Sequence, residues 1–423
     1  MWIRGGLVLD PANNVQEKAD LCIKDGRISG VYPGGSEKSD EPSINASGLW
    51  VLPGLIDMHV HLRDPGFEYK EDIASGSMAA AAGGVTTLAC MANTDPVNDN
   101  PSVTNYILEK ARQVSKVRIL PVGAVTKGLK GKELAEMGLM KKAGIVAVSD
   151  DGNPIEDSSL LRMAMEYAAT FGLRVISHCQ DRSMCASGVM NEGALSSLLG
   201  LPGIPQVCED IMVARDILVS QYTGIPIHIT HISTKGGIDI IRQAKQRGVK
   251  VTCDVTPHHL LLTEEKVRSY DTNAKMYPPL RSEADRKALL EALKGSLIDC
   301  IATDHAPHAR DEKALDFDTA PFGMIGLQTL LPSIMKIHLE YGIDFMKLLA
   351  CVTAHPAGIL GIEGGDLQVG SRADITLFDP EAKWTFTEQD VKSRSINSAF
   401  LGQEFTGRVV QTFLQGKTVY SAT

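Results

Sequence analysis

The feature that most constrains the fold of this chain is a series of short apolar runs that alternate with helical stretches. In sequence order the eight runs read GLIDMHVHL, GVTTLACM, VRILPVG, GIVAVSD, LRVISH, IPIHITHI, VKVTCDVT and IDCIATD. Stretches between them, such as SSLLRMAMEYAATFG, carry the apolar spacing of helices. Eight alternating units predict a parallel sheet covered by helices, and favour a (β/α)8 barrel of the TIM type.

A doubly wound parallel sheet is the competing architecture. Such sheets often carry a Gly-rich phosphate-binding turn after the first strand, and the first run here is followed by no such turn. The barrel is therefore the fold that we expect.

The two ends of the chain show a different pattern. Short alternating runs such as ADLCIKDGRISGV and ADITLFDP are separated by Asn, Gly and Pro clusters, which predicts small antiparallel strands. Because both ends share this pattern, we expect residues 1–53 and 363–423 to form one composite β-sandwich domain beside the barrel, residues 54–362.

Composition excludes several classes of function. The net charge of -9 comes with no basic run, so no nucleic-acid surface is expected. The start of the chain lacks a signal-peptide pattern, and the apolar run MAAAAGGVTTLACMA is broken by Gly and Thr, so we expect no membrane segment and a cytoplasmic location. The eight cysteines include no CxxC pair, which favours reduced thiols in the core.

Histidines and aspartates stand at the ends of five runs, where barrel enzymes carry their chemistry. In order they are His59 and His61, Asp150 and Asp151, His178, His231, and Asp304. A lone strand histidine is more often a core residue, but His59 and His61 share one strand face and all five strand ends meet at one rim. Imidazole and carboxylate suit Zn²⁺, and a bridging carboxylate would hold two metals about 3.5 to 4 Å apart.

Two further residues are interpreted from their positions. Asp304 is placed to contact both metal and water, so it could pass a proton to a leaving nitrogen, whereas the alternative role is to cap the following turn. His228 precedes His231 by three residues and falls on the opposite strand face, so we expect it to pack in the core.

Longer segments of the sequence resemble a known family. The HxH pair, SDDG and ATDHAPH are similar to the amidohydrolase superfamily, while HVHLRDPG, ANTDPV, TPHHLLLTEE, PPLR and APFGMIGLQT resemble the class I dihydroorotases. The resemblance covers nearly the whole chain. It implies metal ligation by His59, His61, Asp151, His178, His231 and Asp304, with Asp151 as the bridging group.

The resemblance also implies a substrate site and a reaction. Arg63, Asn93 and His308 would bind the substrate carboxylate, and Tyr277, Phe322 and Gly323 join the substrate-binding residues. With one or two Zn²⁺ per chain, the activity would be the reversible cyclisation of N-carbamoyl-L-aspartate to (S)-dihydroorotate, with loss of water, in pyrimidine biosynthesis. In the hydrolytic direction a metal-activated water attacks the ring amide, with Asp304 as general base and acid. A homodimer, or a complex with aspartate transcarbamoylase, is the assembly implied.

Two positions depart from the family pattern. Ala92 stands where the family usually has Pro, before Asn93, and Tyr277 stands where it usually has an Asn that contacts the pyrimidine ring. Tyrosine is larger and offers one hydroxyl instead of an amide, so ring recognition is expected to differ.

Two alternatives remain open. A hydantoinase, dihydropyrimidinase or allantoinase would generally bridge its metals with a carboxylated lysine at the end of the fourth strand, and GIVAVSDDG contains no lysine. An inactive dihydroorotase-like partner of aspartate transcarbamoylase would be expected to lose metal ligands, whereas every predicted ligand is present.

Overall fold

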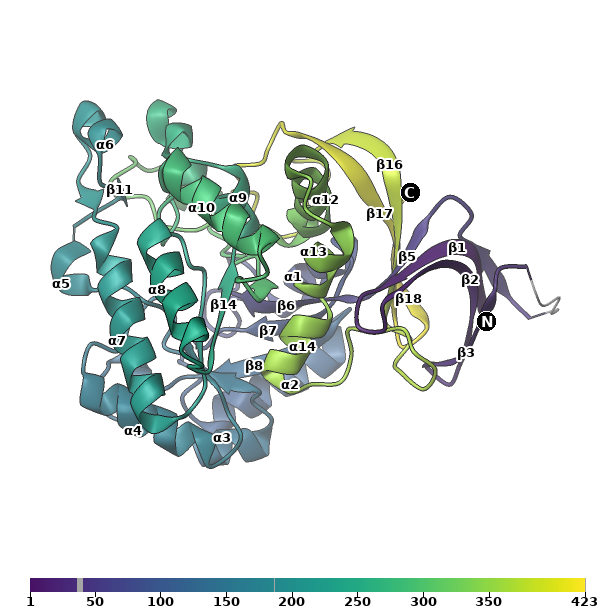
Figure 1. The fold of residues 1–423 in the computed structure, drawn as a ribbon, viewed down its shortest axis with the longest axis horizontal. Coiled ribbons are helices and arrows are strands. Elements are labelled where there is room, and N and C mark those ends of the chain that lie inside the picture. Colours follow the sequence, from purple (N-terminus) through teal and green to yellow (C-terminus); the bar gives the residue numbers. More distant parts are fainter. Residues whose placement is uncertain (36–40, 186, 423) are drawn as a thin grey trace.

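A parallel eight-stranded sheet forms the centre of the computed structural model, which describes residues 1–35, 41–185 and 187–422 (Figure 1). Its strands, in spatial as in chain order, are β6 (Leu55–Val60), β7 (Val85–Cys90), β8 (Arg118–Gly123), β9 (Ala147–Val148), β10 (Val175–Ser177), β13 (Ile227–Ile229), β14 (Val251–Val255) and β15 (Cys300–Ile301). Each of the eight apolar runs contains one of these strands, and the predicted (β/α)8 barrel is confirmed.

The barrel is nearly closed at the seam between its first and last strands. Val60 and His305 form a parallel bridge there, and the His61 N–H donates to the His305 carbonyl at 2.8 Å. Small and medium side chains fill the barrel interior, among them Met58, Ala89 and Val122. The seam places the residues after β6 and β15 side by side at the mouth of the barrel.

Helices surround the barrel sheet. The longer ones are α1 (Ile73–Ala82), α2 (Pro101–Val114), α3 (Met137–Ala143), α4 (Ser158–Ala169), α7 (Val207–Thr223), α8 (Lys235–Gln246), α10 (Glu283–Lys294), α12 (Leu330–Tyr341), α13 (Phe345–Ala350) and α14 (Ala354–Leu360). Side chains that favour N-cap positions start several of them, including Asp72, Asn100 and Asp157. None of the described helices is long and apolar enough to cross a bilayer.

Short elements line the loops at the barrel mouth and elsewhere on the rim. They are α5 (Arg182–Cys185), α6 (Ala194–Leu199), α9 (Pro257–Leu261), α11 (Arg310–Lys313), the parallel pair β11 (Met190–Asn191) and β12 (Gly203–Ile204), and the 3-10 turns η1 (Lys127–Leu129), η2 (Glu264–Ser269), η3 (Thr272–Ala274) and η4 (Leu327–Thr329).

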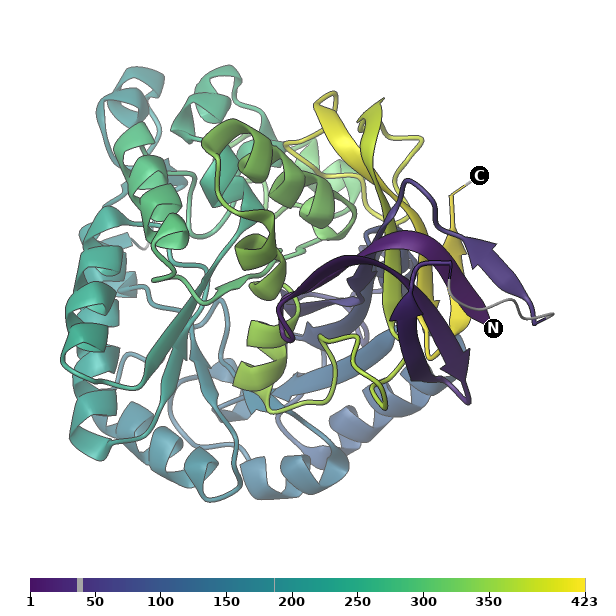
Figure 2. The ribbon, with the colours of Figure 1, turned by 45° about the vertical axis from the view of Figure 1, so that its right-hand side comes forward.

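The two ends of the chain form one eight-stranded sheet beside the barrel, coloured purple and yellow in Figures 1 and 2. Its strands are β1 (Trp2–Asp10), β2 (Val15–Lys24), β3 (Arg27–Pro33), β4 (Ser43–Asn45), β5 (Trp50–Pro53), β16 (Ile375–Thr385), β17 (Glu404–Leu414) and β18 (Lys417–Ser421). Antiparallel pairing of β5 with β16 joins the two ends, and the sheet has a core of its own that includes Leu21, Ile28 and Phe413. The division at residues 53/54 and 362/363 stays a prediction.

Polar contacts tie this terminal sheet to the barrel. The hydroxyls of Thr376 and Thr412 each donate at 2.7 Å to a carbonyl near the end of α1, those of Gly84 and Ala81. Arg118, at the start of β8, pairs with Asp374 at 3.1 Å. The terminal sheet is therefore docked on the side of the barrel. Its contacts hold the end of α1 and the start of β8 in place.

Candidate metal centre

Two groups of possible metal ligands meet at the mouth of the barrel. One contains His59, His61 and Asp151, and the other contains Asp151, His178 and His231, with the ligand atoms of each group within 4.8 Å of one another. All five side chains are buried, and each follows or ends a different strand apart from the two histidines of β6. The strand ends thus bring together the residues that the sequence predicts as ligands.

Asp151 stands between the two groups. Its Oδ2 lies 3.4 Å from Nε2 of His59 and 3.4 Å from Nε2 of His61. Its Oδ1 lies 3.2 Å from His231 Nε2 and 3.4 Å from His178 Nδ1. One carboxylate oxygen therefore faces each pair of imidazoles, which is the arrangement that a carboxylate bridging two cations requires.

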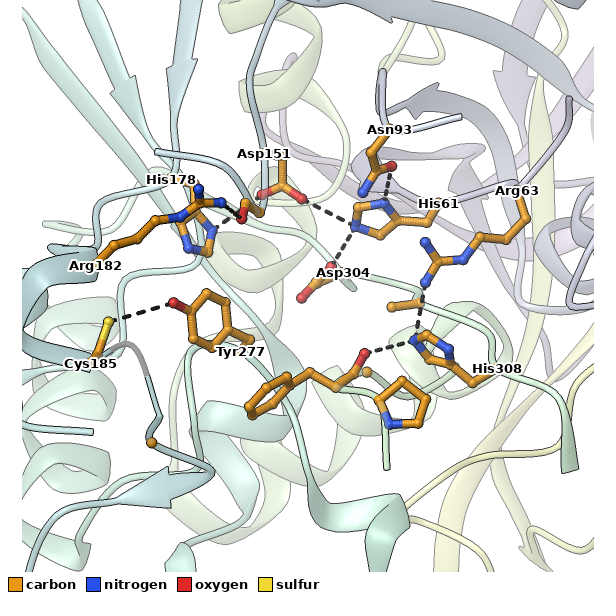
Figure 3. A pocket seen from close by; sticks show the side chains of 16 residues that line it. His61, Arg63, Asn93, Asp151, His178, Arg182, Cys185, Tyr277, Asp304 and His308 are labelled. Carbon is orange, nitrogen blue, oxygen red and sulfur yellow. Dashed lines mark hydrogen bonds and ion pairs between the residues drawn. The ribbon is translucent and has the colours of Figure 1, made fainter. Parts of the chain in front are cut away.

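Asp304 completes the first group from the last strand. Its Oδ1 lies 3.0 Å from His61 Nε2 and 3.6 Å from His59 Nε2, and its side chain lines the cavity above them (Figure 3). By contrast, the Asp150 carboxylate accepts from the N–H groups of Val125 and Thr126 and from the Thr126 hydroxyl. The Asp150 carboxylate therefore stabilises the loop after β8 by hydrogen bonds. Asp151 is the aspartate that faces the histidines.

The side chains at this site fit a divalent cation. Buried polar atoms normally have hydrogen-bond partners, yet Nε2 of His59 and Nε2 of His178 have none within the described part of the chain. His178 Nδ1 and His231 Nε2 lie only 3.0 Å apart. Imidazole nitrogens and carboxylate oxygens converging in this way suit zinc and similar metals.

The electrostatics of the cluster favour a bound cation. Burial opposes ionisation of Asp151, but the charge of His59 and hydrogen bonds from His178 and His231 hold its pKa well below the usual value. The pKa of Asp304 is likewise lowered, against burial, by His61 and His59. For His59, burial disfavours the charged ring, but Asp151 and Asp304 raise its pKa to about 10. Both carboxylates are therefore ionised, and the His59 ring carries a proton when no metal is bound.

Polar residues behind the ligands fix their orientation. The Thr230 hydroxyl donates to Asp254 Oδ2 at 2.9 Å, so it accepts from His59 Nδ1 at 2.7 Å, and Nε2 of a neutral His59 keeps its lone pair for a cation. Asp254 Oδ1 also accepts the His231 N–H at 2.7 Å. Such outer contacts typically contribute 10- to 100-fold to metal affinity.

His228 belongs to the same network. It is buried, as expected, but its ring meets Asp254 at 2.8 Å and Thr252 at 2.8 Å and is not packed among apolar side chains alone. Sequence reasoning did not find Thr230 and Asp254, because nothing in the sequence indicates which side chains of neighbouring strands meet.

Three of the expected site residues adopt a left-handed backbone. Arg63, His231 and Asp304 have φ values of 60°, 37° and 48°. Non-glycine residues in this region cost about 1–3 kcal/mol each and cluster at functional sites. Their strained conformations are held by surrounding contacts, such as the bond from the His231 N–H to Asp254.

A cavity of about 560 Å³ opens above the cluster (Figure 3). Its lining includes all six predicted substrate-binding residues, Arg63, Asn93, Tyr277, His308, Phe322 and Gly323, together with His61, Asp151, His178 and Asp304. His59 and His231 are absent from the lining because they lie deeper. Arg182 and Cys185 also line the cavity and were not expected from the sequence, which carries no motif for them.

One end of the cavity is built to receive an anion. Arg63 forms no ion pair with any residue of the described ranges; its Nε donates to the Pro307 carbonyl at 3.2 Å and its Nη2 approaches His308 at 3.3 Å. Burial and the charge of Arg63 lower the pKa of His308 to about 2, so this ring is neutral. The guanidinium charge is left for a ligand to neutralise.

Asn93 lies between this end and the metal ligands. Its Oδ1 is 2.8 Å from His61 Nδ1, so the amide NH₂ is the donor that Asn93 can offer to a ligand in the cavity. Ala92, in place of the family proline, is buried, and its carbonyl accepts from the N–H groups of Thr94 and Asn98. These bonds close the turn that presents Asn93.

The opposite wall is aromatic. The Tyr277 ring stacks on His178 with centroids 5.2 Å apart and an interplanar angle of 21°, and it lies 5.1 Å from the Phe322 ring. The Tyr277 hydroxyl points to Cys185 Sγ at 3.6 Å (Figure 3). Gly323 lines the cavity, but its N–H donates to the Lys275 carbonyl at 2.8 Å, and a Cβ there would lie 2.8 Å from the Ala306 carbonyl.

The fold has close counterparts among solved structures. An L-hydantoinase (dihydropyrimidinase) from Arthrobacter aurescens has a TM-score of 0.89 at 24% identity, over 99% of this chain and 96% of that one. A dihydropyrimidinase from Brevibacillus agri has a TM-score of 0.85 at 21% identity, over 99% and 95%. This likeness shows the fold, and the His and Asp cluster at its mouth defines the class as a barrel protein with a candidate metal centre.

Sequence relatives specify the family within that class. Residues 48–237 match the family model described as dihydro-orotase-like. Curated dihydroorotases from Geobacter metallireducens and Geotalea daltonii are 52% and 50% identical to this chain, each over 99% of both sequences. The chain belongs to the dihydroorotase family.

Proposed function

We propose that this chain is a metal-dependent dihydroorotase that interconverts N-carbamoyl-L-aspartate and (S)-dihydroorotate in pyrimidine biosynthesis. One observation carries the proposal: a guanidinium without an ion-pair partner in the described chain, that of Arg63, shares a cavity with two groups of metal ligands that meet at Asp151. The cation suits a substrate carboxylate, and the ligand groups suit hydrolysis of an amide. Family membership supports the same reaction.

His59, His61, Asp151, His178, His231 and Asp304 would hold one or two Zn²⁺ ions. When bound, the metal acts as a Lewis acid that polarises the amide carbonyl and makes water a stronger nucleophile. Zinc is the metal proposed because the donors are imidazoles and carboxylates in a buried site.

Asp304 is the proposed proton-transfer group. It lines the cavity and is held by His61, and its lowered pKa keeps it ionised, so it carries no proton before the reaction begins. In ring opening it takes the proton from the attacking water and delivers it to the departing ring nitrogen. In ring closure the same proton moves in the opposite direction.

Arg63, Asn93 and His308 are proposed to bind the carboxylate that the ring carries. Arg63 supplies the charge, and the Asn93 amide supplies an N–H donor. Tyr277 and Phe322 would cover a face of the ring by aromatic contact, in place of an amide hydrogen bond to it. Gly323 keeps the wall close to Ala306, which no larger residue would permit.

A substrate panel tests this function. The zinc-loaded protein is incubated with dihydroorotate, hydantoin, dihydrouracil and allantoin, and ring opening is followed for each. We expect turnover of dihydroorotate and little turnover of the uncharged rings, and turnover of only an uncharged ring would overturn the proposal.

Arg63→Met should raise KM for dihydroorotate far more than Arg310→Met, a control at an exposed arginine that pairs with Glu388.

We further propose a cytoplasmic location and an assembly, either a homodimer or a complex with aspartate transcarbamoylase. The location is supported by eight cysteines that are all buried and unpaired.

The assembly is supported by family resemblance and by exposed apolar side chains along α7, such as Leu218 and Tyr222. Light scattering of the purified chain, alone and with aspartate transcarbamoylase, measures the assembly; a monomer under both conditions would contradict it.

A further inference from the structure

Two lysines are buried directly behind the substrate wall. Lys275 is 2% exposed and Lys313 is 8% exposed. Buried lysines are normally paired with a carboxylate, but neither of these forms an ion pair within the described ranges. An apolar side chain would fill the same space at lower cost, so we expect the buried amino groups of Lys275 and Lys313 to have a function.

Both ammonium groups donate to main-chain carbonyls across two segments. Lys313 Nζ donates to the carbonyls of Thr272 and Pro321, each at 2.8 Å, and reaches that of Lys275 at 3.4 Å. Lys275 Nζ donates to the Asp318 carbonyl at 3.0 Å. The pair thus cross-links residues 272–277 to residues 313–323.

These two segments carry the aromatic wall of the cavity. Tyr277 follows Lys275 by two residues, and Phe322 follows the carbonyl of Pro321 that Lys313 binds. Lys275 Nζ also lies 4.6 Å from the centroid of the Phe322 ring, a cation–π contact. The Phe322 carbonyl accepts from His308 Nε2 at 2.7 Å, so the cross-link extends to the carboxylate end of the cavity (Figure 3).

A second observation relates Lys313 to the carboxylate end. After burial and the charge of Arg63, the charge of Lys313 is the next cause that lowers the pKa of His308. Burial and the charge of Lys275 lower the pKa of Lys313 to about 7, so the fraction of Lys313 that is protonated near neutral pH acts on the place where a substrate carboxylate would lie. An apolar residue at position 313 would fill the space without supplying this charge.

We propose that Lys275 and Lys313 are positioning residues for substrate binding, which hold Tyr277, Phe322 and His308 in one fixed arrangement around the ring and its carboxylate. The inference rests on the proposed function, because the substrate is the one named there. Neither lysine lines the cavity, so neither takes part in the chemical step. Their effect falls on the affinity for the substrate and leaves the metal ligands in place.

The test compares Lys313→Met and Lys275→Met with wild type, using zinc-loaded full-length protein. Lys287→Met is the matched control, because Lys287 is 70% exposed on α10 and is not one of the residues of the proposed cross-link. KM and kcat for dihydroorotate, zinc content and Tm are measured for each protein. We expect KM to rise about tenfold or more in both variants, with zinc content unchanged and kcat within about threefold of wild type.

The conservative variant Lys313→Arg, which keeps a cation and several donors, should recover part of the affinity lost in Lys313→Met. If a Met variant does not fold, Lys313→Gln and Lys275→Gln, which keep N–H donors without the charge, are measured instead, with a rise in KM expected. A lowered Tm with KM within twofold of wild type would overturn the inference, as would a fall in kcat alone. If wild type itself fails to turn over dihydroorotate, the proposed function fails first, which separates the two claims.

Discussion

Among single residues, Asp304 connects the proposed metal ligands to the cavity in which the substrate would bind. Its Oδ1 meets His61 at 3.0 Å, while the side chain also lines the cavity. Burial opposes its ionisation, but the neighbouring imidazoles lower its pKa, so the carboxylate is ionised in the resting site. This combination is what proton transfer between water and a ring nitrogen requires.

Asp304→Asn should therefore lower kcat for dihydroorotate by about 10²- to 10⁴-fold, since the amide cannot accept the proton. Steady-state kinetics with zinc content measured on the same sample checks this, because Asp304 is also a proposed ligand. Asp316→Asn, an exposed aspartate of the same rim segment, is the matched control. Wild-type kcat in Asp304→Asn would refute the role.

Metal binding should release protons, and the protonated His59 ring should make metal affinity increase as the pH rises. Without metal, Asp151 and Asp304 raise the pKa of this buried ring to about 10, so it carries a proton at pH 7. A cation needs the nitrogen unprotonated, and affinity should therefore increase about tenfold per pH unit between pH 6 and pH 9 for each proton displaced. Zinc titration by calorimetry in buffers of different ionisation enthalpy counts the protons, with zinc-saturated protein as the control. Binding without proton release would contradict the account.

The residues of the site were predictable only in part. His59 and His61 could be found because an i, i+2 spacing places both on one strand face, and the other strand-end residues because a barrel gathers those ends. Thr230 and Asp254 could not be found, since their roles depend on β13 lying beside β14. The buried lysines could not be found either, because a lysine in a loop sequence is ordinarily exposed.

At the scale of elements, the packing of α1 against the segment before α12 sets the position of the first strands. Gly83 ends α1, and a Cβ built there would lie 2.1 Å from the Leu327 carbonyl. Because the neighbour is backbone, it cannot move aside without shifting η4. A glycine is thus required for close approach between these two elements.

Gly83→Ala should lower the free energy of unfolding by about 1–3 kcal/mol through overpacking. Gly358→Ala is the control, because it lies inside α14 with nothing within 4 Å of its Cβ, and it should stabilise by about 0.4–1 kcal/mol. Urea unfolding of both variants measures the difference. Equal unfolding midpoints for the two would refute this account of the packing.

The sequence predicts where the strands and helices lie better than it predicts which strands pair with one another. Each apolar run contains a barrel strand, although β9 and β15 span only two residues each, because apolar patterning marks burial and not the length of a hydrogen-bonded ladder. Pairing of β5 with β16 joins residues more than 300 apart, for example Ile375 opposite Pro53. Similar patterning of the two ends suggested this pairing, but no local signal sets its register.

At the scale of the whole molecule, the C-terminal segment reaches the substrate site. Asn397, which is buried, accepts the His308 N–H at 3.0 Å through its side-chain oxygen. Its amide donates to the carbonyls of Ala306 and Gly323, at 3.2 and 3.0 Å. The loop between β16 and β17 thereby supports the carboxylate end of a cavity built mainly by the barrel.

Asn397→Ala should therefore weaken substrate binding, with a rise in KM of about tenfold, and should lower stability by about 1–3 kcal/mol for each of the three buried groups that lose their partner. Kinetics and urea unfolding on one preparation measure both effects. Asn45→Ala, in β4 of the terminal sheet, is the control and should leave KM unchanged. An unchanged KM in Asn397→Ala would show that the terminal segment does not support the site.

The cluster at the barrel mouth is proposed to make this chain a metal-dependent dihydroorotase. The most direct test is to strip the protein with a chelator, restore zinc in steps, and record the initial rate of dihydroorotate ring opening together with bound zinc. We expect no turnover in the stripped protein and a rate that rises with bound zinc until it saturates at one or two ions per chain. Full turnover without metal, or a zinc-saturated protein that leaves dihydroorotate intact, would contradict it.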